Sequence, residues 1–148
     1  MPKFDNVQKL LNHIQAKIEN ALEIEVLEAI KETQTDMIQE YVYDAYTPKQ
    51  YIRRGPDNGG YGDPNNIHGF VENGVLRVRN LTPPNPNYRT KIKPSAYVAP
   101  AIESGKMYTW YSPGARPAIA KTVEELKMTK SHMKALKNGL IRQNINVR

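Results

Sequence analysis

The longest stretch without a helix breaker is residues 3–47, which contain neither glycine nor proline. Apolar residues recur there every three or four positions, in two successive sets: Val7, Leu10, Leu11, Ile14 and Ile18, then Leu22, Val26, Leu27, Ile30, Met37, Ile38 and Tyr41. This spacing places them on one helical face. We predict one long helix, or two helices with a bend near Asn20, whose apolar face belongs to the core. Asp5 and Gln8 have the spacing of an N-terminal capping box, with Asp5 as the N-cap.

A β-hairpin is predicted next. The segments 67–72 and 75–80 flank Asn73-Gly74, the dipeptide that favours a two-residue type I′ turn. In this register one side of the hairpin is apolar and contains Ile67, Gly69, Val71, Leu76 and Val78. The other side contains His68, Phe70, Glu72, Arg77 and Arg79. This side is either the solvated face of a half-exposed sheet or a surface for a partner.

The last part of the chain predicts an amphipathic helix that starts at Pro117 and runs almost to the C-terminus, with Gly139 at its C-terminal cap. One stripe is apolar: Ile119, Val123, Leu126, Met133, Leu136 and Leu140. The opposite face is basic: Lys121, Lys127, Lys130, Lys134 and Lys137. Such a face is either solvated or turned towards a polyanion or an acidic partner. Before it, residues 96–105 predict a short helix or turn that ends at Gly105.

Two long segments, about 43–66 and 81–95, are rich in turn residues and nearly free of apolar periodicity. Loops of this length are uncommon in a compact monomer unless they are functional or disordered. Tyrosine and arginine alternate in the first of them. These residue types stack on nucleic-acid bases, and they are also favoured in protein interfaces. We infer that both segments are arms ordered by neighbouring subunits.

Charge is distributed unevenly along the 148 residues, although the net charge is +6. Residues 1–46 hold four basic and nine acidic side chains, residues 47–115 hold nine and four, and residues 116–148 hold eight and two. An acidic first third and a basic remainder can pair within one chain or between copies. The size fits one domain over residues 1–148. With 39% apolar residues and a mean hydropathy of -0.66, its core should be modest.

No constellation of catalytic residues is evident. His13, His68 and His132 are scattered, cysteine is absent, and no serine lies in a Gly-x-Ser-x-Gly elbow. The sequence also lacks an apolar run long enough to cross a membrane, and the N-terminus lacks the apolar core of a signal peptide. We expect a protein that is not an enzyme, with no cofactor, no metal and no membrane contact.

Four stretches carry a resemblance to a known family: 43–48 with Arg53-Arg54 soon after, the hairpin at 67–80, the Tyr97–Gly105 segment, and Ala115-Arg116-Pro117-Ala118-Ile119 at the start of the last helix. In this order they resemble the small neck, or tail-completion, proteins of long-tailed bacteriophages, the superfamily that includes lambda's minor tail protein Z. Ala118 stands where this family usually has an aromatic residue. The resemblance covers most of the chain.

The resemblance implies an α+β fold with a long N-terminal helical region, a small antiparallel sheet containing the hairpin, and a long C-terminal amphipathic helix. It implies a virion protein, assembled in the bacterial cytoplasm, that forms a ring between the connector and the tail tube and lets the genome pass. Its partners would be copies of itself, the connector or adaptor, tail proteins and, transiently and without sequence preference, genomic DNA. Two alternatives stay open: a tail terminator of the same virion, or a basic accessory protein that binds double-stranded DNA.

This hypothesis assigns residues to two kinds of surface. The candidates for contacts between subunits are Tyr43, Tyr46, Tyr51, Arg53, Arg54, Tyr61, Tyr97, Trp110 and Arg116. The candidates for facing DNA are Arg77, Arg79, Lys127, Lys130 and Lys134.

Overall fold

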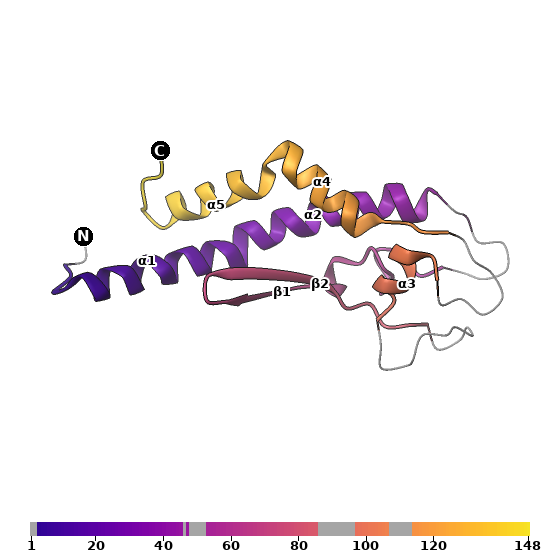
Figure 1. The fold of residues 1–148 in the computed structure, drawn as a ribbon, viewed down its shortest axis with the longest axis horizontal. Helices are drawn as coiled ribbons and strands as arrows, with labels where there is room; N and C mark the ends of the chain where they lie inside the picture. Colours follow the sequence, from indigo (N-terminus) through magenta and orange to yellow (C-terminus); the bar gives the residue numbers. More distant parts are fainter. Residues whose placement is uncertain (1–2, 46, 48–52, 86–96, 107–113) are drawn as a thin grey trace. The chain divides into compact units, whose positions relative to one another are not determined.

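The computed structural model describes residues 3–45, 47, 53–85, 97–106 and 114–148. They form helices and a two-stranded antiparallel sheet, so the predicted α+β class is confirmed (Figure 1). The chain divides into two compact units. Unit 1 consists of the residues up to Ile30, Gly69–Val78 and Lys130–Arg148, and unit 2 consists of Lys31–His68 and Arg79–Thr129. A single domain over residues 1–148 stays a prediction.

The N-terminal region is one continuous helical run, the first of the two predicted possibilities. Its segments are α1 (Val7–Ala21), the π-helical η1 (Leu22–Val26), α2 (Leu27–Ile38) and the π-helical η2 (Gln39–Tyr43). The junction residues Leu22 and Leu27 keep right-handed helical dihedral angles, so the run does not break near Asn20. Each π-turn adds a residue to one turn and rotates the following side chains away from the regular spacing.

The predicted capping box is wrong by one residue. Asn6, not Asp5, is the N-cap, and its side-chain oxygen accepts a hydrogen bond from the Lys9 backbone N–H at 2.9 Å. The Asp5 carboxylate instead pairs with the Lys9 ammonium at 2.7 Å. Asparagine and aspartate are equally good N-caps, so the sequence did not separate the two.

The hairpin is confirmed in its bounds, turn and register. Strands β1 (Ile67–Glu72) and β2 (Val75–Asn80) are joined by Asn73 and Gly74, whose φ angles of +51° and +75° are those of a type I′ turn. The predicted apolar side is buried or half-buried, and the predicted polar side, including Phe70, is exposed.

The C-terminal region differs from the single helix that was predicted. It forms α4 (Ala118–Thr129) and α5 (Ser131–Arg142), and Lys130 between them has a left-handed φ of +55°. The Thr129 hydroxyl donates to the Glu125 carbonyl oxygen at 2.9 Å. Threonine and serine are weak helix formers, which favours a break at this position.

Gly139 was expected to cap the last helix, but it does not. It is buried inside α5, where a Cβ would lie 2.7 Å from the Ala21 Cβ in α1. A left-handed glycine cap does occur at Gly105, with a φ of +68°, at the end of α3 (Ala99–Ser104). That end point agrees with the prediction.

The largest group of buried apolar side chains lies in unit 2. It joins the end of the long helix to α3 and the start of α4 and contains Ile38, Val42, Tyr43, Tyr61, Ala99, Ile102 and Ala118. Buried polar side chains tie the loops to it: Asn80 donates to the Tyr61 carbonyl oxygen at 2.7 Å, and its own oxygen accepts from the Thr82 backbone N–H at 3.1 Å. Unit 2 therefore has a core of its own.

The segment 53–66 differs from the expectation of an arm ordered by neighbours. It turns back within unit 2 through backbone hydrogen bonds from Gly60 to Gly55 (3.0 Å) and from Asp63 to Gly60 (3.1 Å). The Asp63 carboxylate accepts from the backbone N–H groups of Gly59 (3.0 Å) and Asn65 (2.9 Å). Most of the second predicted arm, residues 86–95, lies outside the described residues.

Candidate interaction surfaces

Tyr43, a candidate for subunit contact, is buried within unit 2. Its hydroxyl accepts a hydrogen bond from the Gly62 N–H at 2.8 Å and donates one to the Arg54 carbonyl oxygen at 3.3 Å. A Cβ at Gly62 would lie 2.9 Å from the Tyr43 ring, so glycine permits this packing. Burial raises the pKa of the Tyr43 phenol. Tyr43 therefore ties the glycine-rich loop to the end of the long helix.

The basic doublet Arg53-Arg54 also bonds within unit 2. The Arg53 guanidinium donates to the carbonyl oxygens of Val42 (3.1 Å) and Tyr43 (3.0 Å) and lies 4.8 Å from the centre of the Tyr43 ring. Carbonyl groups in the last turn of a helix lack intrahelical partners, and a cation there complements the helix dipole. Arg54 donates to the Pro83 carbonyl oxygen at 2.6 Å. Arg53 therefore stabilises the end of the long helix, and Arg54 joins two loop segments of unit 2.

Two motifs of the family resemblance, one around Glu103 and one around Arg116, meet at the start of α4. The Glu103 carboxylate accepts a hydrogen bond from the Ile119 backbone N–H at 2.7 Å. The Arg116 backbone N–H donates to the Ile102 carbonyl oxygen at 3.0 Å. A carboxylate at a helix N-terminus satisfies a free N–H and complements the positive end of the dipole. Glu103 thus caps α4 from a different element.

Tyr61 lies in the same part of unit 2 and is 4% exposed. Burial raises the pKa of its phenol, the Glu103 carboxylate raises it further, and the Arg116 guanidinium opposes this shift. Arg116 itself is 9% exposed. Tyr43, Tyr61 and Arg116 are thus side chains of the unit 2 core, and their assignment to subunit contacts stays a prediction.

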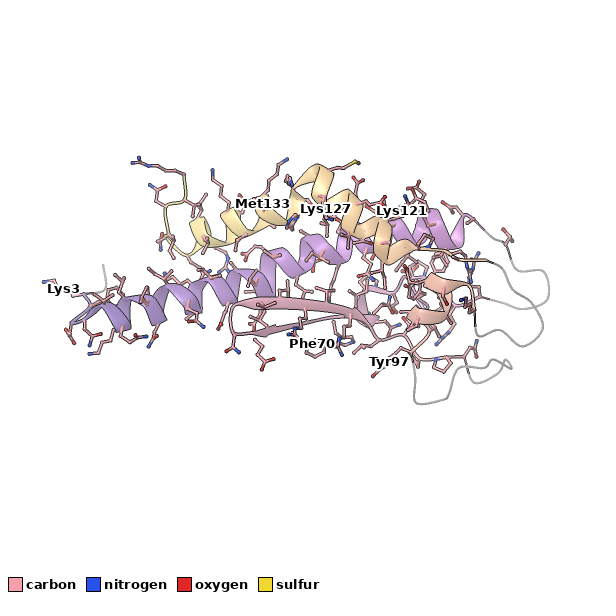
Figure 2. All side chains as sticks on the ribbon, in the orientation of Figure 1. Lys3, Phe70, Tyr97, Lys121, Lys127 and Met133 are labelled. Atoms are coloured by element: carbon pink, nitrogen blue, oxygen red, sulfur yellow. The ribbon has the colours of Figure 1, made fainter. Side chains whose placement is uncertain are left out.

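The other candidates for subunit contact fall into two groups. Tyr97 is 48% exposed and projects from the segment before α3 (Figure 2). Tyr46, Tyr51 and Trp110 lie outside the described residues.

All five candidates for facing DNA have exposed side chains. Arg77, Lys130 and Lys134 belong to unit 1, whereas Arg79 and Lys127 belong to unit 2. A phosphate backbone requires exposed cations, so this exposure is compatible with the assignment but does not distinguish DNA from an acidic protein.

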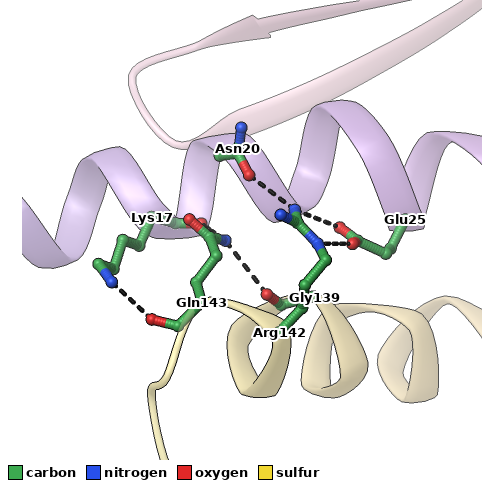
Figure 3. Close-up of polar contacts among 6 residues, drawn as sticks. All are labelled: Lys17, Asn20, Glu25, Gly139, Arg142 and Gln143. Atoms are coloured by element: carbon green, nitrogen blue, oxygen red, sulfur yellow. Dashed lines mark hydrogen bonds and ion pairs between the residues drawn. The ribbon is translucent and has the colours of Figure 1, made fainter.

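In unit 1, α5 is fastened to the long helix by polar contacts (Figure 3). The Arg142 guanidinium pairs with the Glu25 carboxylate and donates to the Asn20 side-chain oxygen at 2.8 Å. The Gln143 amide donates to the Lys17 carbonyl oxygen at 2.8 Å, and the Lys17 ammonium donates back to the Gln143 carbonyl oxygen at 2.5 Å. The hydrogen bond from Arg142 lowers the pKa of Glu25. These contacts fix which face of α5 points outward.

The first half of α1 presents an apolar stripe that unit 1 does not cover. Val7 is 70% exposed, Leu10 38%, Leu11 53% and Ile14 37%. Periodicity located this stripe in the sequence, but the expectation that it belongs to the core is wrong. Periodicity alone does not tell whether an apolar face packs against its own chain or against another molecule.

Among the residues that the structure describes, no group of three or more histidine, aspartate or glutamate side chains is placed to hold a metal ion. Within the same residues, no helix is long and apolar enough to span a membrane.

Comparison with protein-family models identifies a family for this chain. No curated protein and no protein of solved structure matches the chain. The family model named YomN matches residues 6–142, which include the long helix, the hairpin and the C-terminal helices. The chain therefore belongs to the YomN family, a phage-derived family, and is a phage-associated protein.

Proposed function

We propose that this chain is a structural protein of the phage head–tail junction, a neck or tail-completion subunit that forms a ring between the connector and the tail tube. In this role it is not an enzyme, and its partners are its own copies, the connector or adaptor, and tail proteins. The observation that carries the proposal is the uncovered apolar stripe of α1, formed by Val7, Leu10, Leu11 and Ile14.

Energetics favours a partner for this stripe. Burying a large aliphatic side chain contributes about 1.5–3 kcal/mol, so covering four that are roughly half exposed contributes on the order of 4 kcal/mol. Exposed apolar faces of this kind mark protein interaction sites. A subunit that is completed by its neighbours is the ordinary situation in a virion joint, and membership of a phage-derived family supports that setting.

The charge distribution along the chain supports a ring. Acidic and basic regions on one chain favour contacts between unlike surfaces of successive copies, and such head-to-tail contacts close into rings when the rotation permits. The exposed cations Arg77, Arg79 and Lys127 suit a channel for DNA, because their attraction to phosphate does not depend on sequence.

The test is carried out on phage particles. The protein should be found by mass spectrometry in purified virions in multiple copies, and cryo-EM should place it between the portal and the tail tube. Phages that encode Leu11→Glu should produce heads and tails that fail to join. The matched control is Gln15→Glu, which adds the same charge at an exposed position of the same helix. Absence of the protein from purified particles would end the proposal.

Two other functions remain candidates. A tail terminator would occupy the same joint from the tail side, and the cryo-EM map distinguishes it by position. A DNA-binding accessory protein is favoured by the exposure of Lys127, Lys130 and Lys134. It predicts a gel shift that weakens steeply with salt, and replacing these three lysines by glutamine should reduce the salt slope by roughly three phosphate contacts. An unchanged DNA affinity would exclude it.

A further inference from the structure

The outward face of α5 combines lysines with apolar side chains. Counted from Lys130, the N-cap of α5, the residues Met133, Lys134, Lys137 and Ile141 lie three, four, seven and eleven positions along the chain, so these four share one side of the helix. All five are exposed, Met133 by 57% and Ile141 by 50%. The opposite side of α5, at Gly139, is the one packed against α1 and η1 (Figure 3). The packed side of the helix is therefore fixed, and this lysine face is left open.

The three lysines of this face lack acidic partners in the described part of the chain, where none of them takes part in a salt bridge. Water alone does not favour two exposed apolar side chains, Met133 and Ile141, on the same face as the lysines. Phosphates make no apolar contacts, whereas a protein partner buries methionine and aliphatic side chains together with lysine stems. The composition of the face thus favours a protein with acidic side chains over a nucleic acid.

The same chain carries such an acidic surface. In unit 2, Glu32, Asp36 and Glu40 lie one turn apart along α2 and η2, and all three are exposed. Among the described residues none of them forms a salt bridge, although the Lys121 ammonium, which pairs with Glu124 at 2.8 Å, lies near enough to interact with Glu40. We call these three residues the acidic row.

We propose that the lysine face of α5 in one copy docks on the acidic row of a second copy, forming the repeating contact of the assembly. This inference rests on the proposed function, because it identifies the surfaces by which the ring would close. The two surfaces are similar in length: at about 1.5 Å per residue, Ser131 to Lys137 spans about 9 Å with Lys130 preceding it as the N-cap, and Glu32 to Glu40 spans about 12 Å. Three pairs of opposite charge can therefore form between two helices lying side by side.

The contact joins two different surfaces, so each copy offers one of each and the contact repeats. Exposed ion pairs are individually weak, and at physiological salt they act over only about 8 Å. The contact should thus be marginal between free chains and firm when other parts of the assembly hold the copies together.

The chain contains no cysteine, which permits a clean cross-linking test. One batch of full-length protein carries Asp36→Cys and another carries Lys134→Cys. Mixed at low salt and oxidised, they should give a disulfide-linked dimer, while either batch alone should give much less. The same mixture with Gln15→Cys in place of Asp36→Cys is the matched control, because Gln15 is an exposed residue of α1 that does not belong to the acidic row.

Charge reversal provides the second test. Converting Lys130 and Lys137 to glutamate in the Lys134→Cys protein should lower the cross-linking rate several-fold, since each exposed pair contributes up to a few-fold and repulsion is added. Converting Glu32 and Glu40 to lysine in the Asp36→Cys protein should do the same. Mixing the two reversed proteins should restore the rate, because every contact then joins opposite charges again. Restoration is a result that misfolding of either variant does not produce.

The outcomes separate the contact from the proposed function. Cross-linking that is equal for the control pair, insensitive to salt, or not restored in the mixed reversed proteins overturns the contact. If virions contain the protein but the cysteine pair does not cross-link in particles, the contact fails while the neck function stands. If the pair cross-links in solution but virions lack the protein, the function fails and the contact stands as a property of the chain.

Discussion

The replacement Gly139→Ala tests how α5 packs in unit 1. In an isolated helix this change stabilises by about 1 kcal/mol, because glycine has the larger conformational entropy to lose. In unit 1 the new Cβ would lie 2.7 Å from the Ala21 Cβ and 2.5 Å from a Glu25 carboxylate oxygen. The Glu25 side chain can rotate away, but the Ala21 Cβ is bonded directly to the α1 backbone and cannot.

The size of the effect follows from these distances. Non-bonded carbon atoms prefer about 3.5–4.0 Å, so the helices must separate by about 1 Å or distort locally. Overpacking of this kind costs about 1–3 kcal/mol. After the gain in helix propensity is subtracted, Gly139→Ala should lower the free energy of unfolding by about 1 kcal/mol. It should also weaken the Arg142–Glu25 pair, because Glu25 must move.

Urea denaturation followed by circular dichroism measures the change, and hydrogen exchange of the α5 amides locates it. The matched control is Asn138→Ala, the neighbouring exposed position, which should gain a few tenths of a kcal/mol from helix propensity alone. In the Ala21→Gly background the cost of Gly139→Ala should shrink, because the clashing methyl is gone. If Gly139→Ala stabilised the protein as much as propensity predicts, α5 would not pack on α1 as described.

Three further predictions concern single contacts. Glu103→Ala should cost about 1 kcal/mol in urea denaturation by removing the cap of α4, whereas Glu124→Ala, an exposed control, should cost little; equal effects would contradict the capping role. The lowered pKa of Glu25 means that its contribution to stability is present above its ordinary pKa of 4.5 and is lost as the pH falls through the lower pKa of the folded state. The Arg142→Ala variant should lack this acid-dependent loss of stability, and an acid titration of its unfolding checks the pairing of Arg142 with Glu25. The raised pKa of Tyr61 means that its contribution is present below pH 10 and is lost as the pH rises further. Tyr61→Phe should therefore flatten the alkaline decline in stability, and an unchanged decline would contradict the burial of this phenol.

The elements that were predicted well are those determined by short-range chemistry. Asn73-Gly74 requires two positive φ angles and permits them, so the turn fixed the register of both strands. Gly105 ended α3 for the same reason. The absence of glycine and proline from residues 3–47 allowed one uninterrupted helical run. In each case the deciding residues are neighbours in the sequence.

Features that depend on distant residues were not predicted. Gly139 has the sequence context of a cap, but its role comes from Ala21 and Glu25, more than a hundred residues away. No glycine or proline next to Lys130 indicates its left-handed conformation in the sequence. The π-turns rotate the apolar side chains that follow them around the helix axis, although the spacing of these residues in the sequence does not change. The helical face that meets the core could therefore not be predicted from periodicity.

The same distinction applies to the candidate surfaces. Tyrosine and arginine in and near a glycine-rich loop suggested contacts with other molecules. The Arg53 guanidinium instead donates to a carbonyl oxygen at the end of a helix in its own unit, and Tyr43 and Arg54 also form hydrogen bonds within that unit. A helix end needs partners for its carbonyl groups wherever it stops, and this need competes with any external role for nearby donors. Exposed cations such as Arg77 and Lys134 were predicted correctly as surface residues, because an unpaired charge is costly to bury.

Because the loop candidates bond within their own unit, we expect the assembly contacts on helices rather than on loops. The described loop residues 53–66 form hydrogen bonds within unit 2, whereas α1 and α5 each have an exposed face with apolar side chains. A helical face holds its side chains at fixed spacing before binding, so less conformational entropy is lost on docking than when a loop becomes ordered. If assembly depends on helical faces, changes at Leu11 or Lys134 should abolish it while leaving each unit folded. Changes at Tyr43 or Arg53 should instead unfold unit 2, and loss of assembly would then follow loss of structure.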